Sequence, residues 1–354
     1  MKKLIIVMGL VFTFFACRKP TENTMPVTTV TSQAVITDFV QKVALPQYAG
    51  LLTNATLLNN SLKALNTTPN NANLQAARDA WRATRHSWEQ CEGFLIGPVE
   101  DNNYDPDMDT WPVDYHQLDS FITTSTSFDV ATVHSLEQSL KGFHPLEFIL
   151  WGRNGDATVD SITAKEKLYM VSLSQDIQNS VDSLNYSWAS NGGNFQALLL
   201  NAGSGSTRFT TRQEAVLAIA ACITDICDEV GNGKLYEPFS LYDSTKTESP
   251  FSHNSITDFT NNMIGAQNVY LCTYNGQTGN SLSNLVSAKN LALDTKIKTQ
   301  FAAAISALGN VTLNFEPAIY LQRTQLQNAM TAITTLHATL DGELKTFIQT
   351  YVKD

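Results

Sequence analysis

A histidine and a glutamate stand three residues apart in an otherwise apolar stretch, KGFHPLEFILWG, residues 141–152. On a helix, His144 and Glu147 would share a face, so an imidazole nitrogen and a carboxylate oxygen could converge on one metal ion or one substrate. Two ligands are too few for a tight metal site. The zincin pattern H-E-x-x-H needs a second histidine, and the Glu-x-x-His pairs of di-iron bundles run in the reverse order. The spacing therefore assigns no chemistry by itself.

Helix capping accounts for the same two residues equally well. Pro145 has no amide proton and a fixed φ, which suits the first turn of a helix. This would place His144 at the N-cap and Glu147 at the third helical position, where a carboxylate can reach back to free amides. Gly142 would ease the turn that precedes the helix. From spacing alone, a cap and a functional site remain equal alternatives.

Acidic residues elsewhere are less specific. Glu92 lies four residues after Trp88 on the apolar side of a predicted helix, where an unpaired carboxylate is costly. Glu92 is therefore predicted to be paired, bound to a metal or close to solvent at the helix end. The loop EDNNYDPDMDTWPVD (100–114) superficially resembles a calcium loop, but it lacks the required glycine and terminal glutamate, so we expect a solvated acidic loop. Its alternate polar positions are Asp101, Asn103, Asp105, Asp107 and Asp109.

A second polar stretch, SPFSHNSITDFTNNMIGAQNVY, occupies residues 249–270. Ser255 is a predicted N-cap with Asp258 at the third helical position, so part of this polarity is explained by capping. The remaining polar side chains exceed what a cap needs. A serine hydrolase is disfavoured because Ser252 and His253 are adjacent and no G-x-S-x-G elbow occurs.

The amino terminus, MKKLIIVMGLVFTFFAC, predicts export. A basic head, a short apolar run and a small residue before Cys17 are typical of a lipoprotein signal peptide over residues 1–16, after which Cys17 is lipidated. Residues 17–31 then form a polar tether. We expect a protein anchored in a bacterial envelope, on the periplasmic or surface face of the outer membrane, that contacts the membrane through its lipid alone.

The chain is acidic and its cysteines are few. Its formal net charge of −10 becomes −12 when Lys2 and Lys3 leave with the predicted signal, which argues against nucleic acid as a partner and suits the handling of cations. No C-x-x-C zinc signature is present. The cysteines after Cys17 are predicted to be mostly small buried hydrophobic residues rather than bridged pairs. They are Cys91, Cys222, Cys227 and Cys272.

Apolar residues recur at helical spacing through most of the sequence, which predicts an all-α protein. One stripe runs from Leu74 through Trp81 and Trp88 to Leu95, with a single seven-residue step between the two tryptophans. A Gly-rich stretch near the midpoint favours two packed antiparallel helical bundles, at 32–190 and 191–354. Helices are predicted over 33–66 with a kink at Pro46, 74–97, 132–151, 163–189, 212–230, 255–274, 282–308 and 317–352.

Four segments in this order resemble the imelysin family of bacterial envelope proteins, which includes insulin-cleaving membrane peptidases and iron-regulated lipoproteins. They are WEQCEGFLIGPV (88–99), WPVD (111–114), GFHPLEFILW (142–151), which carries the G-x-H-x-x-E signature, and the stretch at 249–270. The resemblance covers nearly the whole chain after the tether, from about Ser32 onward.

The resemblance implies a two-domain helical fold with a functional cleft between the domains, lined by His144 and Glu147. These two residues are the candidates for catalysis and, with Glu92 and Asp114, for holding a divalent or ferric ion, either iron or zinc. The same cleft is expected to include Trp88, Ser252, Asn254 and Asp258.

Two activities follow from the resemblance as alternatives. The first is binding of a metal ion or a small iron-containing ligand, for uptake or its regulation, with an envelope transport partner. The second is a metal-dependent peptidase, in which His144, Glu147 and one of Glu92 or Asp114 would hold zinc and another carboxylate would activate water.

Overall fold

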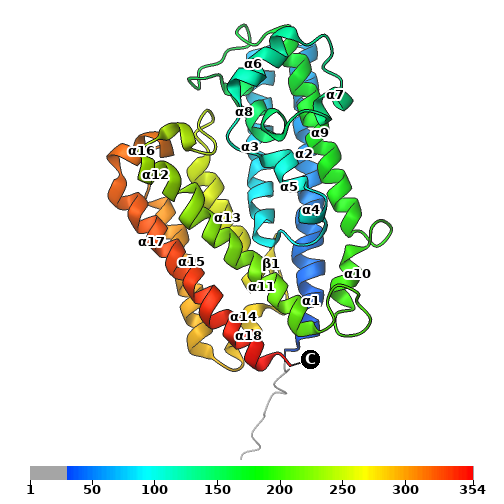
Figure 1. Ribbon diagram of the computed structural model, residues 1–354, viewed down its shortest axis with the longest axis vertical. Coiled ribbons are helices and arrows are strands. Elements are labelled where there is room, and N and C mark those ends of the chain that lie inside the picture. The colour runs from blue at the N-terminus through cyan, green and yellow to red at the C-terminus, as the bar shows by residue number, and fades with distance from the viewer. Residues whose placement is uncertain (1–29, 354) are drawn as a thin grey trace, which may run out of the picture.

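The computed structural model describes residues 30–353 and consists of two groups of helices lying side by side (Figure 1). The predicted signal peptide, Cys17 and the tether up to residue 29 lie outside the described residues. Apart from one short hairpin, the elements of the described part are helical, which confirms the all-α prediction.

The first group is built on three long helices: α2 (Leu45–Thr67), α3 (Asn71–Cys91) and α9 (Ala164–Trp188). Helix α3 carries the predicted apolar stripe, with Trp81 and Trp88 completely buried. Its N-cap is Asn70, whose side chain accepts a hydrogen bond from the amide of Asn73, and it tightens at its end into a 3₁₀ turn, η2 (Glu92–Phe94). That turn aims Glu92 into the interior.

The second group contains α11 (Arg212–Asp228), α13 (Ser255–Leu271), α15 (Leu291–Gly309) and α17 (Arg323–Thr339). Helix α13 contacts α11 and α15 within this group and also packs directly on α3 (Figure 1). The two helices cross closely because α13 has a glycine, Gly265, at the contact. A Cβ atom built on Gly265 would lie 2.3 Å from the carbonyl oxygen of Gln90. The two groups thus meet backbone to backbone beside Glu89 and Glu92.

Shorter elements connect the long ones. Helix α10 follows the predicted boundary between the two bundles, at residues 190 and 191, but it packs against α1 and α9, which precede that boundary. The described helices not yet given are α1 (Ser32–Asp38), η1 (Phe39–Ala44), α4 (Pro98–Asp101), α5 (Tyr104–Asp109), α6 (Tyr115–Thr124), α7 (Val130–His134), η3 (Gln138–Leu140), α8 (Phe143–Trp151), α10 (Phe195–Leu200), η4 (Glu229–Lys234), α12 (Tyr236–Leu241), η5 (Ser244–Lys246), α14 (Leu282–Ser287), α16 (Phe315–Leu321), η6 (Leu340–Leu344) and α18 (Lys345–Tyr351).

Several predicted helices are interrupted. The one predicted over 132–151 is wrong as a single helix: α7 and α8 are separated by a turn in which Lys141 is extended and Gly142 has a φ of +84°. The helix predicted over 255–274 ends at Leu271, where Cys272 turns left-handed into a hairpin of β1 (Thr273–Tyr274) and β2 (Gln277–Thr278). The predicted kink near Pro46 corresponds to the π-helical turn η1.

The cysteine prediction is confirmed for the described residues. Cys91, Cys222, Cys227 and Cys272 are free thiols and all are buried. Between residues 30 and 353, no helix combines the length and apolar character needed to cross a membrane.

Candidate functional site

Gly142 sets the position of His144 and Glu147. A Cβ atom at Gly142 would lie 2.1 Å from the carbonyl oxygen of Met108, so only glycine lets α8 start against the end of α5. The N-cap of α8 is Gly142 and not His144, which corrects the capping interpretation. His144 instead lies in the first turn, and both it and Glu147 are 0 % exposed.

The carboxylate of Glu147 binds the segment that precedes α13 rather than the amides of its own helix. Its Oε1 accepts hydrogen bonds from the amide of Phe251 (3.1 Å) and from the amide and hydroxyl of Ser252 (2.7 and 2.6 Å). Glu147 therefore ties α8 to the start of α13 across the meeting of the two helix groups. Its second oxygen, Oε2, has no hydrogen-bond partner among the described residues.

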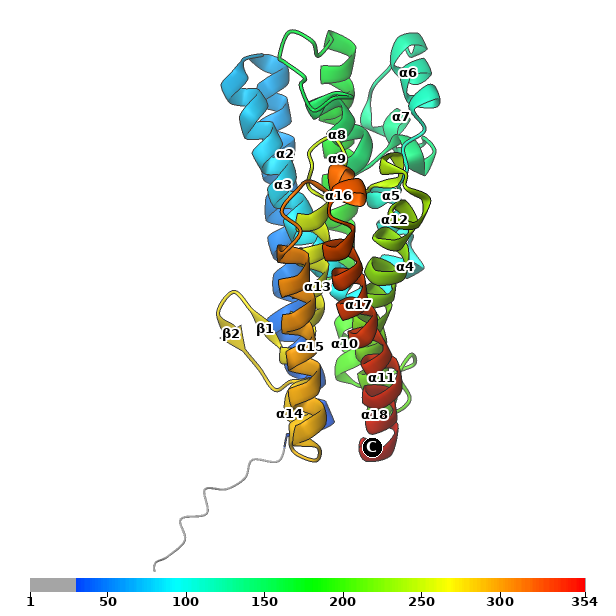
Figure 2. The same cartoon turned by 90° about the vertical axis from the view of Figure 1, so that its left-hand side faces the viewer.

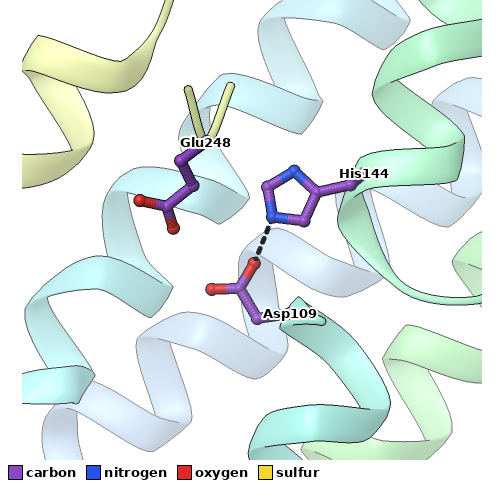
Figure 3. A group of neighbouring side chains, drawn as sticks. All are labelled: Asp109, His144 and Glu248. Atoms are coloured by element: carbon purple, nitrogen blue, oxygen red, sulfur yellow. Dashed lines mark ion pairs between the residues drawn. The ribbon is translucent and has the colours of Figure 1, made fainter. Parts of the chain in front are cut away.

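His144 lies between two carboxylates. Its Nε2 is 3.0 Å from Asp109 Oδ1 (Figure 3), and its Nδ1 is 3.6 Å from Glu147 Oε2. Burial opposes protonation of the ring, but the contacts with Asp109 and Glu147 outweigh it and raise the pKa of His144 to about 9. Neither ring nitrogen has a well-aligned hydrogen bond within the described structure. The edge of Trp111 packs on the ring, with centroids 5.1 Å apart.

Arg85 of α3 is the buried cation at the centre of this region. Its guanidinium forms ion pairs with Glu89 and Asp109 and lies 3.1 Å from Glu248 Oε1. Burial would raise the pKa of the Asp109 carboxyl, yet Arg85 holds that pKa well below its usual range. Asp109 also accepts a 2.7 Å hydrogen bond from Trp88 Nε1.

A second cation, Lys234, enters from the π-helical turn η4. Its Nζ lies 3.2 Å from Glu92 Oε2 and 3.1 Å from Glu248 Oε1. On the opposite side Asn262 of α13 donates to both Glu89 Oε2 and Glu92 Oε2, at 2.6 Å each. The two helix groups therefore share one buried polar cluster.

Carboxyl groups outnumber the basic side chains in this cluster. Besides the imidazole of His144, only Arg85 and Lys234 among its described residues are basic. Burial raises the pKa of Glu89, Glu92 and Asp258, which favours their protonated forms when no further cation is present. The carboxyl groups of the cluster are those of Glu89, Glu92, Asp109, Glu147, Glu248 and Asp258.

Two sets of side chains in this cluster could hold a metal ion. Ligand atoms of Asp109, His144 and Glu248 all lie within 4.8 Å of one another (Figure 3), as do those of Glu89, Glu92 and Asp109. Asp109 belongs to both sets. Imidazole with several carboxylates is a donor set suited to iron or zinc.

The structure brings most of the predicted site residues together. Asp258 accepts from Ser249 Oγ at 2.7 Å and from Asn254 Nδ2 at 2.6 Å, and its Oδ2 lies 3.8 Å from Arg85. This corrects its predicted role as a cap residue of α13, whose N-cap is Asn254. The predicted residues that lie in or against the cluster are Trp88, Glu92, His144, Glu147, Ser252, Asn254 and Asp258.

Asp114 does not lie in the cluster. It is the N-cap of α6, where its carboxylate accepts from the backbone amide (3.0 Å) and side-chain amide (2.9 Å) of Gln117. These hydrogen bonds lower the pKa of Asp114, as expected for an ionised cap near solvent. The acidic loop instead contributes Asp109, whose side chain is 3 % exposed, so the loop is not uniformly solvated.

Five residues of the cluster were not identified from the sequence. One signal for them was present: Arg85 falls inside the seven-residue step of the α3 stripe, between Trp81 and Trp88, and so faces the interior. No comparable pattern marks Lys234, which lies in a Gly-containing turn. The residues missed are Arg85, Glu89, Asp109, Lys234 and Glu248.

A cavity of about 380 Å³ opens beside the cluster and reaches Glu92, Asp109, Lys234 and Glu248. Its lining also includes Asp105, where burial and the nearby charge of Asp109 raise the pKa to about 7. This cavity is the route by which a small ion could approach the buried groups.

Comparison with known proteins agrees with this architecture. Residues 44–341 match the sequence model of the family described as Imelysin. The chain belongs to the imelysin family. Iron-regulated protein A of Synechococcus elongatus is 30 % identical over 328 residues, which cover 90 % of this chain and 88 % of that protein.

Two solved structures share the imelysin fold. A protein described as an iron-regulated protein A precursor, from Parabacteroides distasonis, superposes with a TM-score of 0.82 at 24 % identity, covering 91 % of this chain and 96 % of that one. An imelysin-like protein from Psychrobacter arcticum gives a TM-score of 0.75 at 13 % identity, over 93 % and 98 % of the two chains.

Proposed function

We propose that this imelysin-family protein binds a metal ion in the buried cluster and serves an iron-related role at the cell envelope. The observation that carries the proposal is the excess of buried carboxyl groups over basic side chains around His144. Support for iron comes from the similarity to iron-regulated protein A of Synechococcus elongatus. The lipoprotein-type amino terminus supports an envelope location through a lipid on Cys17.

The hydrogen bonding of the buried side chains around His144 supports a metal ion independently of the family. Buried polar atoms in proteins are nearly always partnered. Here Oε2 of Glu147 and Oε2 of Glu248 have no hydrogen-bond partner among the described residues, and the ring nitrogens of His144 lack a well-aligned one, although they lie 3.0 Å from Asp109 and 3.6 Å from Glu147. A cation bound by one ring nitrogen of His144 together with Asp109 and Glu248 would leave the other nitrogen to pair with Glu147 Oε2, and it would compensate the carboxyl groups as they ionise.

The geometry favours holding an ion over cutting a peptide bond. A metallopeptidase needs an open coordination position that a substrate can reach, together with a base beside it. His144 and Glu147 are 0 % exposed, and the adjoining cavity of about 380 Å³ is near the lower end of small-ligand sites. Binding is therefore the proposed activity.

The proposal is tested by metal analysis and calorimetric titration with Fe²⁺ under anaerobic conditions, ferric citrate and Zn²⁺. We expect the wild-type protein to bind one of these metals, and the His144→Ala, Glu147→Ala double variant to lose that binding while keeping its helical circular dichroism. Glu248→Gln, which keeps the shape of the side chain, should weaken binding at least about tenfold.

A matched control removes a histidine and a carboxylate elsewhere. His134 and Asp176 form a pair 2.9 Å apart on α7 and α9, outside the cluster. The His134→Ala, Asp176→Ala variant should bind metal like the wild type. If the wild-type protein binds none of the three metals, the proposal is wrong.

A further inference from the structure

Arg85 and Lys234, which both pair with carboxyl groups of the cluster, differ in their access to solvent. The side chain of Arg85 is 0 % exposed, whereas that of Lys234 is 14 % exposed and lines the cavity of about 380 Å³ beside the cluster. This cavity is bounded by α5, η4 and α12, and Figure 2 shows α5 and α12 on the same side of the molecule. An ion that approaches through the cavity therefore meets the ammonium group of Lys234.

Three carboxylates surround this ammonium group. The Nζ atom of Lys234 lies 3.1 Å from Glu248 Oε1, 3.2 Å from Glu92 Oε2 and 3.3 Å from Glu229 Oε1. Burial opposes the charge of Lys234, but these three carboxylates outweigh burial and raise its pKa well above the usual value. Lys234 is therefore a cation in the metal-free protein.

The ammonium group engages both candidate sets of metal ligands. Glu248 belongs to the set with Asp109 and His144, and Glu92 belongs to the other set. A metal ion held by either set would share a carboxylate with Lys234, and two cations on one carboxylate repel each other strongly in a buried site. Binding of a metal ion is therefore favourable only if the ammonium group moves away.

Glu229 offers the ammonium group a position outside the cluster. The side chain of Glu229 is 50 % exposed and lines the same cavity, whereas those of Glu92 and Glu248 are 4 % and 6 % exposed. The flexible four-carbon stem of a lysine can leave the two buried carboxylates and keep the third without any change in the backbone. The turn also has room, because a Cβ atom built on Gly233 would meet nothing within 4 Å.

We propose that Lys234 is a tethered cation that holds Glu92 and Glu248 in the metal-free protein and moves toward Glu229 when a metal ion binds. This inference rests on the proposed function, since it concerns the control of the same site. Every incoming ion must then compete with an ammonium group. An ion of single charge gains no more from the carboxylates than the ammonium group does, so the arrangement favours ions with two or more charges.

Calorimetric titration of Lys234→Met with Fe²⁺ under anaerobic conditions, ferric citrate and Zn²⁺ tests this proposal. The substitution removes the charge and keeps much of the side-chain length. We expect the metal that the wild-type protein binds to bind this variant at least about tenfold more tightly. Lys246→Met is the matched control, because Lys246 lines the same cavity but pairs with Glu237 where both side chains are more than one-third exposed. It removes the same charge and should change the affinity by less than about threefold, since solvent screens it.

A second measurement uses the wild-type protein and does not depend on the folding of a variant. Acetylation of lysines by an N-hydroxysuccinimide ester, followed by mass spectrometry, reports how accessible each amine is. Lys234 should react severalfold faster with metal bound than without it, because its amine has left the two buried carboxylates. Lys345, whose side chain is 56 % exposed, should react equally fast in both states.

The outcomes separate this inference from the proposed function. If the wild-type protein binds metal but Lys234→Met binds it no more tightly, or if the acetylation of Lys234 does not change, the inference is overturned and the metal site stands. An equal gain from Lys246→Met would also overturn it, because the effect would then be one of net charge. Binding by Lys234→Met alone would support it, whereas no binding by either protein would overturn both proposals.

Discussion

Arg85 is the residue on which the buried cluster depends in the absence of metal. It is completely buried and pairs with Glu89, Asp109 and Glu248. Arg85→Met would keep much of the side-chain volume but leave Glu89 without an ion-pair partner in the described structure. Asp109 would keep only His144, and Glu248 only Lys234. We expect the free energy of unfolding to fall by about 3–5 kcal/mol, as measured by urea denaturation.

A surface arginine provides the control for this substitution. Arg208 pairs with Asp101 where both side chains are at least one-third exposed. Arg208→Met should cost less than about 1 kcal/mol, because solvent screens such a pair. Equal losses in the two variants would show that the cluster does not need the buried cation.

The protonation of His144 makes the metal-free protein sensitive to alkali. Its pKa is about 9 in the folded state against an ordinary value of 6.5, so its stabilising contribution is complete below pH 6.5 and is lost as the pH rises through 9. The raised pKa values of Glu92 and Asp258 act in the same direction, since their neutral forms are favoured by folding.

We therefore predict that the melting temperature of EDTA-treated protein falls between pH 6.5 and pH 9. His144→Asn should reduce the slope of that fall, whereas His134→Asn, at a surface position, should not. A melting temperature that is constant or rises over this range would contradict the assignment of a protonated His144.

Whether a residue of the cluster can be predicted from the sequence depends on whether its partners lie near it in the chain. His144 and Glu147 could be selected because both lie on one short segment, and Trp88 and Glu92 because they share one helix face. Asp109 and Asp114 are both acidic and five residues apart, and only the end of α5 and the cap of α6 decide which one turns inward. The spacing of residues in the sequence does not show which of the two aspartates is buried.

At the scale of elements, the crossing of α3 and α13 holds the cluster in register. Asn262 lies one turn before Gly265 and donates to Glu89 and Glu92, so a shift of α13 would move its amide away from both. A methyl group on Gly265 would meet the backbone of Gln90, which cannot rotate away. Gly265→Ala should cost about 1–3 kcal/mol or more in the free energy of unfolding and should also weaken metal binding.

Gly342 offers the opposite case, in the π-helical turn η6 between α17 and α18. Nothing lies within 4 Å of a Cβ atom placed there. Gly342→Ala should therefore leave stability unchanged or raise it by up to about 1 kcal/mol. The free energy of unfolding of both variants is measured in urea, and their metal binding by calorimetry. Similar effects of the two substitutions would contradict the claim that the close contact of α3 and α13 at Gly265 holds the cluster in register.

The long helices were predictable because each carries its own apolar period, as α3 and α9 do. The interruptions were not, because they depend on distant contacts. Gly142 breaks the helix predicted over 132–151 where it meets Met108. Gly142 and Pro145 are local signs of a helix start, but the contact with Met108 that fixes its position cannot be read from the segment. The capping interpretation of His144 was wrong for the same reason. The contact of Gly142 with Met108 of α5 places the N-cap of α8 at Gly142, two residues before His144.

At the scale of the whole molecule, the proposed metal would connect the two groups of helices. Asp109 and His144 come from α5 and α8 in the first group, whereas Glu248 precedes α13 in the second (Figure 3). A ligand that binds only the folded arrangement stabilises it by mass action and suppresses local opening of the segments that hold it.

Hydrogen exchange with and without the bound metal tests this connection. We expect slower amide exchange over Tyr104–Asp109, over Phe143–Trp151 and over residues 247–255, with no change in α15, which contributes no ligand. The His144→Ala, Glu147→Ala variant should show no metal-dependent change in any of these segments. Protection confined to one helix group would mean that the ion is held by that group alone, and that the meeting of the two groups around Glu248 has another role.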